Sequence, residues 1–537
     1  MVGTRDATGL VKGYALTRLQ EALQLEMIHC FAAEGREAVE VAYPVVMQSC
    51  PGDWHEMAGR YREWAVRQPW CRRPVRERED IPKAVRDAGA MAMVSYRMAA
   101  TPPQQAVEIA QEALRKWGEV GAGPLLIHTR GWEKHGTWVA QEYFPPFPDE
   151  ATFAATSRAA REQGSEHLVF LSGYVWTRTF GKKDDGSFEY DSRDYFEREL
   201  KGHAVVEANG EVHVRRSSWL AGGENAELCR GDEWSRELIS RVTEQLRGYG
   251  VRLVQIDQLV GGGGPVCYAA NHGHPPGPGL WVHEAVVDQM ERMLREGRAE
   301  GEFGLSLEEP NELYVPYLAL YHGRDHEVQG WPLVGGAEPL PLFAYVYHEY
   351  ARGYSGWLTH GIQGFREGNY GIALRYTTAL AIANGKLLAF PVGFESEDKG
   401  VAGENRLLVA GARLATGPGK PWLAYGRMVP PPGLECATIE AVRTGQEGQK
   451  PAVYRWPGVV HQAYEDGDGR RAVVLVNHTR EKQRAALGPS DGWRAEQLVR
   501  SGAEGVAIEA LDPKAGPPAV ELAPQEVALV VLGKAGP

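Results

Sequence analysis

Short apolar runs alternate with amphipathic helical stretches through the middle of the chain. Apolar runs of strand length occur at 125–132, 167–176, 226–229, 251–257, 303–309, 341–350 and 386–393. Most are separated by segments whose apolar residues recur at helical spacing, which is typical of βα units around a parallel sheet. We therefore predict an α/β fold, a (β/α)8 TIM-type barrel. Residues 422–428 are the only candidate for an eighth strand, so closure of the barrel is inferred.

The two ends of the chain have a different pattern. Residues 21–49 contain two β-rich pieces, which we interpret as a short N-terminal β segment or the remnant of a larger β-domain. From about residue 430 the helical period disappears, and short strands alternate with turns such as Asp466–Gly469, which favours an antiparallel β-sandwich. The predicted domains are 1–50, 51–429 and 430–537.

Composition narrows the class of protein. The 537 residues are 43% hydrophobic and 24% charged, which excludes a disordered chain. The chain has a net charge of −12 and no cluster of basic residues, so we expect no nucleic-acid partner. No run of about 18 apolar residues and no signal peptide is found, so we predict a cytoplasmic protein without a membrane partner. The six cysteines never form CxxC, so a zinc site is not indicated.

The chemistry of a barrel lies at the carboxyl ends of its strands. Asp257 ends the apolar run 251–256, and Glu308 follows Leu307 one βα unit later. Adjacent barrel strands are ~5 Å apart, and two carboxyl groups ~5–5.5 Å apart are what a retaining glycosidase needs. The alternative for each carboxylate is a structural cap or ion pair, and acidic residues at barrel mouths also bind metals.

Glu308, Glu309 and Glu312 all compete for the second catalytic position. Strand alternation puts Glu308 on the face of Ser306 and Gly304, and Glu309 on the other. Pro310 argues against a helix through Glu308 and Glu312. We therefore favour Glu308 and keep Glu312 in reserve.

Aromatic and polar residues at the other strand ends and loops are candidates for substrate binding. His272-Gly273-His274 also invites a hydrolase metal centre with Asp257 and His348. Against this, the metal-dependent barrels it would resemble carry such a pair on their first strand, so we predict neither a metal nor a cofactor. The predicted substrate-binding residues are Trp132, Trp176, Gln258, His272, His274, Tyr347 and His348.

Several strings together resemble a known family. These are GDEWSRELISRV, VRLVQIDQ, CYAANHGHPPGPGLW, LSLEEPNELYV and PLFAYVYHEY, in this order. They resemble a bacterial domain-of-unknown-function family with a glycoside-hydrolase-like barrel, over about residues 50–430. The family is distantly similar to the retaining α-glycosidase barrels of α-amylase-like and endo-α-N-acetylgalactosaminidase-like enzymes. That similarity implies that Asp257 is the nucleophile and Glu308 the acid/base.

The sequence thus predicts a glycoside hydrolase that acts on an oligosaccharide or glycoside, with a retaining mechanism. Two other functions stay open: a non-catalytic carbohydrate-binding barrel and a metal-assisted barrel hydrolase. The sequence does not fix the sugar, the anomer or the oligomeric state.

Overall fold

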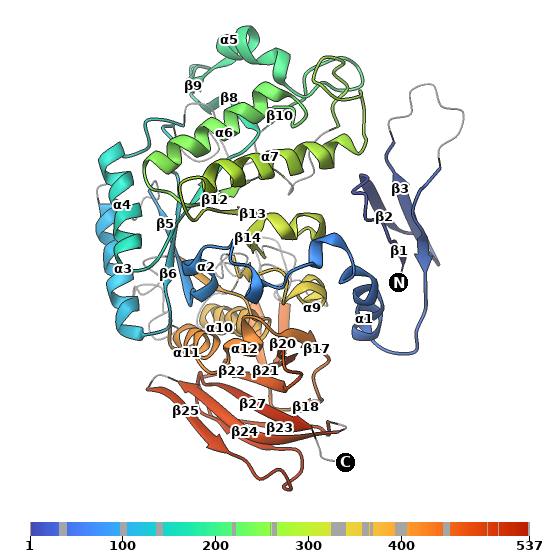
Figure 1. Cartoon of the computed structure of the whole chain (residues 1–537), viewed down its shortest axis with the longest axis vertical. Helices are drawn as coiled ribbons and strands as arrows, with labels where there is room; N and C mark the ends of the chain where they lie inside the picture. Colours follow the sequence, from blue (N-terminus) through green and yellow to red (C-terminus); the bar gives the residue numbers. More distant parts are fainter. Residues whose placement is uncertain are drawn as a thin grey trace.

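The structure is a computed structural model of the chain. It describes residues 2–31, 40–96, 105–135, 143–216, 222–257, 259, 266–323, 340–356, 365, 369–391, 405–443, 452–490, 492–502 and 504–534. A central barrel carries small N-terminal sheets on one side and a C-terminal β-sandwich at one end (Figure 1).

Eight parallel strands form the central sheet, in the order β15-β14-β13-β12-β7-β6-β5-β16. A parallel bridge between Tyr354 and Leu387 joins the two edges, which closes the barrel. The predicted (β/α)8 barrel is therefore confirmed. Its strands are β5 (Ala90–Ser95), β6 (Leu125–Arg130), β7 (His167–Leu171), β12 (Leu253–Ile256), β13 (Gly304–Leu307), β14 (Leu318–His322), β15 (Gly353–Tyr354) and β16 (Leu388–Pro391).

Alternation along these strands fills the barrel interior. Met91, Leu126, Leu168, Leu253 and Leu387 pack there into one buried cluster. The intervening residues face outward and pack against the helices in a second, larger cluster. The main helices are α1 (Trp54–Ala65), α3 (Ala106–Val120), α4 (Glu150–Glu162), α6 (Glu233–Gly248), α7 (Trp281–Arg298), α10 (Asn369–Ala383) and α11 (Asn405–Thr416).

Helix α6 shows why these segments are helical. Its N-cap residue Asp232 accepts a hydrogen bond from the Ser235 amide, and Glu233 lies in the first turn. Ile239, Val242 and Leu246 repeat at helical spacing and are buried against the barrel.

The sequence prediction contained two errors about the barrel strands: it missed the first one, and it included one that belongs to another sheet. Residues 90–95 form the first barrel strand, β5, although their small side chains gave a weak signal. Residues 226–229 overlap β11 (Glu224–Glu227), which lies in a separate antiparallel sheet, β10-β11-β8-β9. The errors compensate, so 251–257 and 303–309 keep their predicted places as strands four and five.

Residues 341–350 and 422–428 were also misassigned. Residues 342–347 form the short helix α9 (Leu342–Tyr347), which is buried over most of its length. Because nearly all its side chains are apolar, the sequence has no polar–apolar period that would distinguish a helix from a strand. Residues 420–423 form α12 (Lys420–Leu423), and β17 (Arg427–Val429) pairs with the C-terminal sheet. The true later strands are β14, β15 and β16.

The antiparallel sheet is an insertion between β7 and α6. Besides β11 it contains β8 (Val175–Lys182), β9 (Phe188–Asp191) and β10 (Val214–Arg216). Because it connects the carboxyl end of a barrel strand to the following helix, it lies on the side of the barrel where active sites occur. In Figure 1 it is drawn at the top, above α6 and α7.

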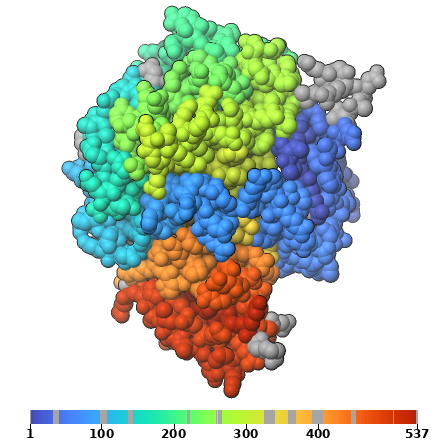
Figure 2. All heavy atoms as spheres, viewed as in Figure 1, coloured from blue at the N-terminus to red at the C-terminus, as the bar shows by residue number. Residues whose placement is uncertain are grey.

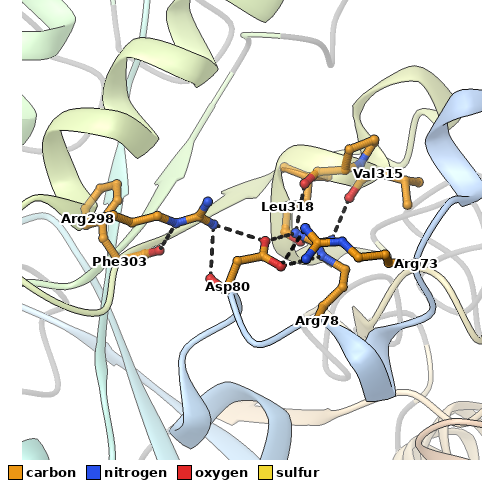
Figure 3. A network of polar contacts seen from close by, with 8 residues as sticks. Arg73, Arg78, Asp80, Arg298, Phe303, Val315 and Leu318 are labelled. Carbon is orange, nitrogen blue, oxygen red and sulfur yellow. Dashed lines mark hydrogen bonds and ion pairs between the residues drawn. The ribbon is translucent and has the colours of Figure 1, made fainter.

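The opposite end of the barrel is closed by the segment before β5. The buried Arg78 guanidinium donates to the carbonyls of Val315 and Leu318, at 2.9 Å each, and pairs with Asp80 at 2.7 Å. Arg298 of α7 reaches the same carboxylate at 3.2 Å (Figure 3). This network ties the chain that enters the barrel to the connection between β13 and β14.

The C-terminal part is an antiparallel two-layer structure, as predicted. A six-stranded sheet, β17-β21-β22-β27-β24-β25, packs on a three-stranded sheet, β18-β23-β26, around a separate apolar cluster. The strands are β18 (Leu434–Glu435), β19 (Thr438–Arg443), β20 (Ala452–Pro457), β21 (Val459–Glu465), β22 (Arg471–Asn477), β23 (Gln483–Leu487), β24 (Trp493–Gly502), β25 (Gly505–Ala510), β26 (Ala519–Leu522) and β27 (Val527–Lys534).

The sandwich packs directly on the barrel helices, as the continuous surface in Figure 2 shows. The Tyr464 hydroxyl donates to the Ala383 carbonyl at 2.6 Å, and the Ser501 hydroxyl donates to the Ala410 carbonyl at 2.7 Å. The rings of Trp456 and Tyr376 stack at 4.3 Å.

The N-terminal strands form two small sheets beside α1. β1 (Val2–Thr4) pairs with β4 (Val45–Met47), and β2 (Lys12–Arg18) forms a hairpin with β3 (Leu23–His29). Several large apolar side chains of the hairpin are exposed, including Leu16 and Leu23. Among the described residues, no helix is long and apolar enough to cross a membrane.

Candidate active site

Asp257 and Glu308 lie side by side at the carboxyl end of the barrel. β12 and β13 are paired in parallel register, with Ile256 opposite Leu307. Asp257 directly follows β12, and Glu308 directly follows β13. Neighbouring strands are ~4.8 Å apart, so the register brings the two residues to the same point of the rim.

Alternation along β12 and β13 puts both side chains on the inward face. Leu253 is part of the interior cluster, and Gln255 accepts a hydrogen bond from the Tyr354 hydroxyl across the barrel. Asp257, two residues on, continues this face and is 3% exposed. Glu308 follows Gly304 and the buried Ser306 in the same way.

A cation stands close to both carboxylates. Arg130 is the last residue of β6 and shares the inward face of Leu126 and His128. Burial lowers the pKa of its guanidinium, and electrostatic interactions with Tyr354, Glu308, Asp257 and Glu133 oppose this shift. One guanidinium therefore interacts with both predicted catalytic carboxylates.

Glu133 is a site residue that sequence reasoning missed. Its side chain is fully buried, and Ser172 donates to its Oε1 at 3.0 Å. Burial, and then the charges of Glu133 and Asp257, raise the pKa of Tyr143. The sequence places Glu133 three residues after Arg130, the end of β6, so it was a possible candidate. Nothing in the sequence indicated that its carboxyl group would be buried.

The packing behind Asp257 is tight. The Asp257 amide donates to the Leu171 carbonyl at 2.8 Å, which extends the pairing of β12 with β7. Gly173 has a φ of +67°, and a Cβ there would lie 2.2 Å from the Asp257 carbonyl oxygen. A glycine is therefore needed where the chain leaves β7.

Glu312 lies elsewhere, in the layer of helices outside the strands. Tyr61 of α1 donates to its two carboxylate oxygens at 2.8 and 2.7 Å, and Tyr347 of α9 donates to Oε2. Burial raises the pKa of Glu312 although both hydroxyls act to lower it. Its other charged neighbours are Lys12 and Asp6 of the N-terminal segment. Glu312 joins α1 to α9, and this position does not fit a catalytic role.

The two tryptophans predicted to bind substrate are core residues. Trp132 is fully buried, stacks on Tyr143 at 5.8 Å, and donates its indole N–H to the Phe170 carbonyl at 2.5 Å. Trp176 is 4% exposed and packs on Tyr195. Neither ring presents a face to a sugar, so these two assignments do not fit the structure.

Tyr347 and His348 are not at the mouth either. Tyr347 is buried, with its hydroxyl on Glu312. His348 faces the sandwich, where its Nδ1 lies 2.7 Å from the Gly426 carbonyl and its ring packs on Tyr464. Burial lowers its pKa to about 4. Gln258, the last predicted contact, lies outside the described residues.

His272 and His274 are brought together with two cysteines. His274 Nε2 lies 3.1 Å from the Cys229 sulfur, and His272 Nδ1 lies 3.5 Å from that of Cys267. All four residues are buried. Both histidines are thus engaged inside the loop and are not placed to bind a sugar, and they do not group with Asp257 or His348 as the predicted alternative metal centre required.

Comparison with known proteins identifies the family. The family model described as Domain of unknown function (DUF6259) matches residues 39–358, more than half of the chain. The chain belongs to the DUF6259 family. The matched region of this DUF6259 protein includes β5 to β15, both carboxylates of the rim and the cysteine–histidine cluster.

One curated relative and several solved structures are similar to this DUF6259 chain. A Bacteroides thetaiotaomicron protein named "Putative glycoside hydrolase" is 24% identical over 315 residues, which are 58% of this chain and 42% of the relative. The chain therefore spans less than half of that relative's length. The α-N-acetylgalactosaminidase NagBb of Bifidobacterium bifidum has a TM-score of 0.54 at 16% identity, over 86% of this chain and 69% of that one.

A maltogenic α-amylase, AmyB of Thermotoga neapolitana, has a TM-score of 0.52 at 10% identity, over 84% of this chain and 99% of that one. At such identities the likeness establishes the fold alone. The DUF6259 protein therefore has the barrel fold that these glycoside hydrolases share. Its curated relative is itself named as a glycoside hydrolase.

Proposed function

We propose that the chain is a retaining glycoside hydrolase in which Asp257 is the nucleophile and Glu308 the general acid and base. The observation that carries the proposal is the register of β12 and β13, which puts the two residues next to each other on the inward face of the rim. With backbones ~4.8 Å apart, the two side chains can bring their carboxyl groups to the ~5–5.5 Å separation of retaining enzymes.

The reaction uses each carboxyl group twice. Asp257 attacks the anomeric carbon while the glycosidic oxygen takes a proton from Glu308 and leaves as an alcohol. Glu308 then removes a proton from water, which attacks the glycosyl ester and releases the Asp257 carboxylate. Arg130, which interacts electrostatically with both carboxylates, balances part of their charge.

We propose an α-glycoside as the substrate class. Two structures that share the fold are named as an α-N-acetylgalactosaminidase and a maltogenic α-amylase, and both names specify an α linkage. A screen of nitrophenyl α- and β-glycosides identifies the sugar and tests the anomer.

The test of the roles is kinetics of two variants on the aryl glycoside that the screen selects. Asp257→Asn removes the nucleophile, so we expect kcat to fall by at least about 10³-fold, without rescue to the wild-type product by azide. Glu308→Gln removes the proton donor, so we expect a loss of about 10²- to 10⁴-fold for poor leaving groups, a smaller loss for good ones, and rescue by azide.

Glu312→Gln is the matched control, because its carboxyl group lies four residues from Glu308 but between two tyrosines. It should keep kcat near that of the wild type. Near-wild-type turnover in Asp257→Asn would overturn the assignment. A binding protein would show affinity without turnover, and a metal-assisted hydrolase would show a kcat that depends on which divalent metal is supplied.

A further inference from the structure

A second site lies within the insertion and the loop that follows β12. Within the described part of the chain, four ligand-type side chains converge: Cys229, Cys267, His272 and His274. Cys229 follows β11, and the other three belong to the loop between β12 and α7. The two segments meet because residues 203–206 pair with both. The Cys229 amide donates to the His203 carbonyl at 2.9 Å, and the Tyr268 amide to that of Val206 at 2.8 Å.

The spacing of the four ligand atoms fits a tetrahedral ion. All lie within 4.8 Å of one another, and the two sulfur–nitrogen pairs named above are 3.1 and 3.5 Å apart. Around Zn²⁺, with bonds of ~2.3 Å to sulfur and ~2.0–2.1 Å to nitrogen, ligand atoms of a tetrahedron are about 3.3–3.8 Å apart.

Each histidine directs one ring nitrogen to a backbone carbonyl and the other to the cysteines, as metal-binding histidines do. The Nε2 of His272 lies 2.7 Å from the Gly202 carbonyl, and the Nδ1 of His274 lies 2.8 Å from the Pro275 carbonyl. A carbonyl only accepts, so these nitrogens carry the protons. The lone pairs of the other two nitrogens, Nδ1 of His272 and Nε2 of His274, therefore point at the cysteines.

The surroundings hold this arrangement rigidly. The His274 ring stacks on Trp281 at 3.6 Å, and a Cβ at Gly231 would lie 2.4 Å from the same ring. The Asp232 amide donates to the Cys229 carbonyl at 3.2 Å, which fixes the turn that carries this cysteine.

We propose that Cys229, Cys267, His272 and His274 bind one Zn²⁺. Two thiolates and two imidazoles at tetrahedral spacing select zinc, and four protein ligands leave no open position, so the ion is structural. It fastens the far end of the loop whose first residue is Asp257 to the insertion that covers the same side of the barrel. The proposal stands independently of the glycosidase assignment.

The first test is the metal content of the full-length protein expressed with zinc and dialysed. We expect about one zinc per chain in the wild type, and less than about a tenth in Cys229→Ser, Cys267→Ser and His274→Ala. Cys436→Ser is the matched control, because that half-buried thiol lies in the sandwich, near the Val459 carbonyl. It should keep the wild-type content. A metal-free wild type that also fails to bind added zinc, or cluster variants that retain zinc, would overturn the proposal.

The second test uses only wild-type protein, so it does not depend on the folding of a variant. Replacement of zinc by Co²⁺ should give the visible absorption of a tetrahedral site with sulfur-to-metal charge transfer, and zinc should displace it. A Cys229–Cys267 disulfide is the competing arrangement and would leave both histidine lone pairs unused. Finding that disulfide in unreduced peptides, or an octahedral cobalt spectrum, would refute the proposal.

Discussion

At the scale of single residues, Glu312 shows how burial makes a carboxyl group sensitive to pH. Burial raises its pKa in the folded protein in spite of two tyrosine donors. A group with a raised folded pKa contributes stability below its ordinary pKa of 4.5, and this contribution is lost as pH rises through the folded value.

Glu312→Gln should therefore change stability in a pH-dependent way. The amide that replaces the carboxyl group is always neutral, so the variant should gain stability relative to the wild type as pH rises from about 4 to about 8. Urea unfolding of both proteins across this range measures the difference. A difference that does not vary with pH would show that Glu312 titrates alike in the folded and unfolded chain.

Asp80 behaves in the opposite way. Burial would raise its pKa, but the hydrogen bond and charge of Arg78, and the charges of Arg298 and Arg73, hold it below the usual value. We expect Asp80→Asn to cost about 1–3 kcal/mol near pH 7, because the buried Arg78 loses its carboxylate partner.

The contribution of Asp80 is present above its unfolded pKa of 3.8 and is lost as pH falls through the lower folded value. The melting temperatures of Asp80→Asn and the wild type should therefore differ strongly at pH 7 and only slightly at pH 3. Glu77→Gln, in an exposed pair with Arg76, is the control and should change the melting temperature little at either pH. Equal effects of the two variants would contradict the network.

The sequence predicted some site residues and not others for a physical reason. Asp257 and Glu308 follow apolar strands, so the local pattern was enough to predict their position at the carboxyl ends of β12 and β13; their catalytic role stays a prediction. Trp132 and His272 needed tertiary information: an indole at a strand end stacks on substrate or on the core according to the neighbouring helix. Cys229 and Cys267 lie far apart in the sequence, and the segment 203–206 pairs with the chain at both.

At the scale of elements, the contact of β20 with α10 joins barrel and sandwich. Trp456 is 5% exposed and stacks on Tyr376. We expect Trp456→Ala to destabilise the protein by about 3–5 kcal/mol, because it leaves a cavity at this junction. Calorimetry measures the change.

Val453→Ala is the control on the same strand, since Val453 is 58% exposed, and it should cost less than about 0.5 kcal/mol. If both variants were equally stable, the junction would contribute little to the stability of the protein.

The elements that sequence predicted best are those with a clear period. α6 and α4 begin at Asp caps and bury apolar residues at helical spacing, which is the pattern that predicts helices between the strands. α9 is buried on several faces, and β15 has two residues, so neither had a readable period. The barrel could be predicted as a class, whereas the numbering of its strands could not.

At the scale of the whole molecule, the sandwich covers part of the barrel. Helix α10 is buried at every position from Ala373 to Ala379, which is possible only because strands of the sandwich pack on one side and β16 on the other. A chain that stops after residue 426 would expose this apolar helix. We expect it to be insoluble or aggregated when expressed beside the full-length protein, as measured by size-exclusion chromatography. A monomeric, cooperatively melting product would contradict an integral role for the sandwich.

The burial of α10 also has a consequence for synthesis in the cell. The ribosome completes α10 before residues 427–534, which at ~5–20 residues per second takes roughly 5–20 s more. During this time the barrel has all its strands, yet one of its helices lacks its cover. The unfinished chain therefore exposes apolar surface of α10 until the strands of the sandwich have been made.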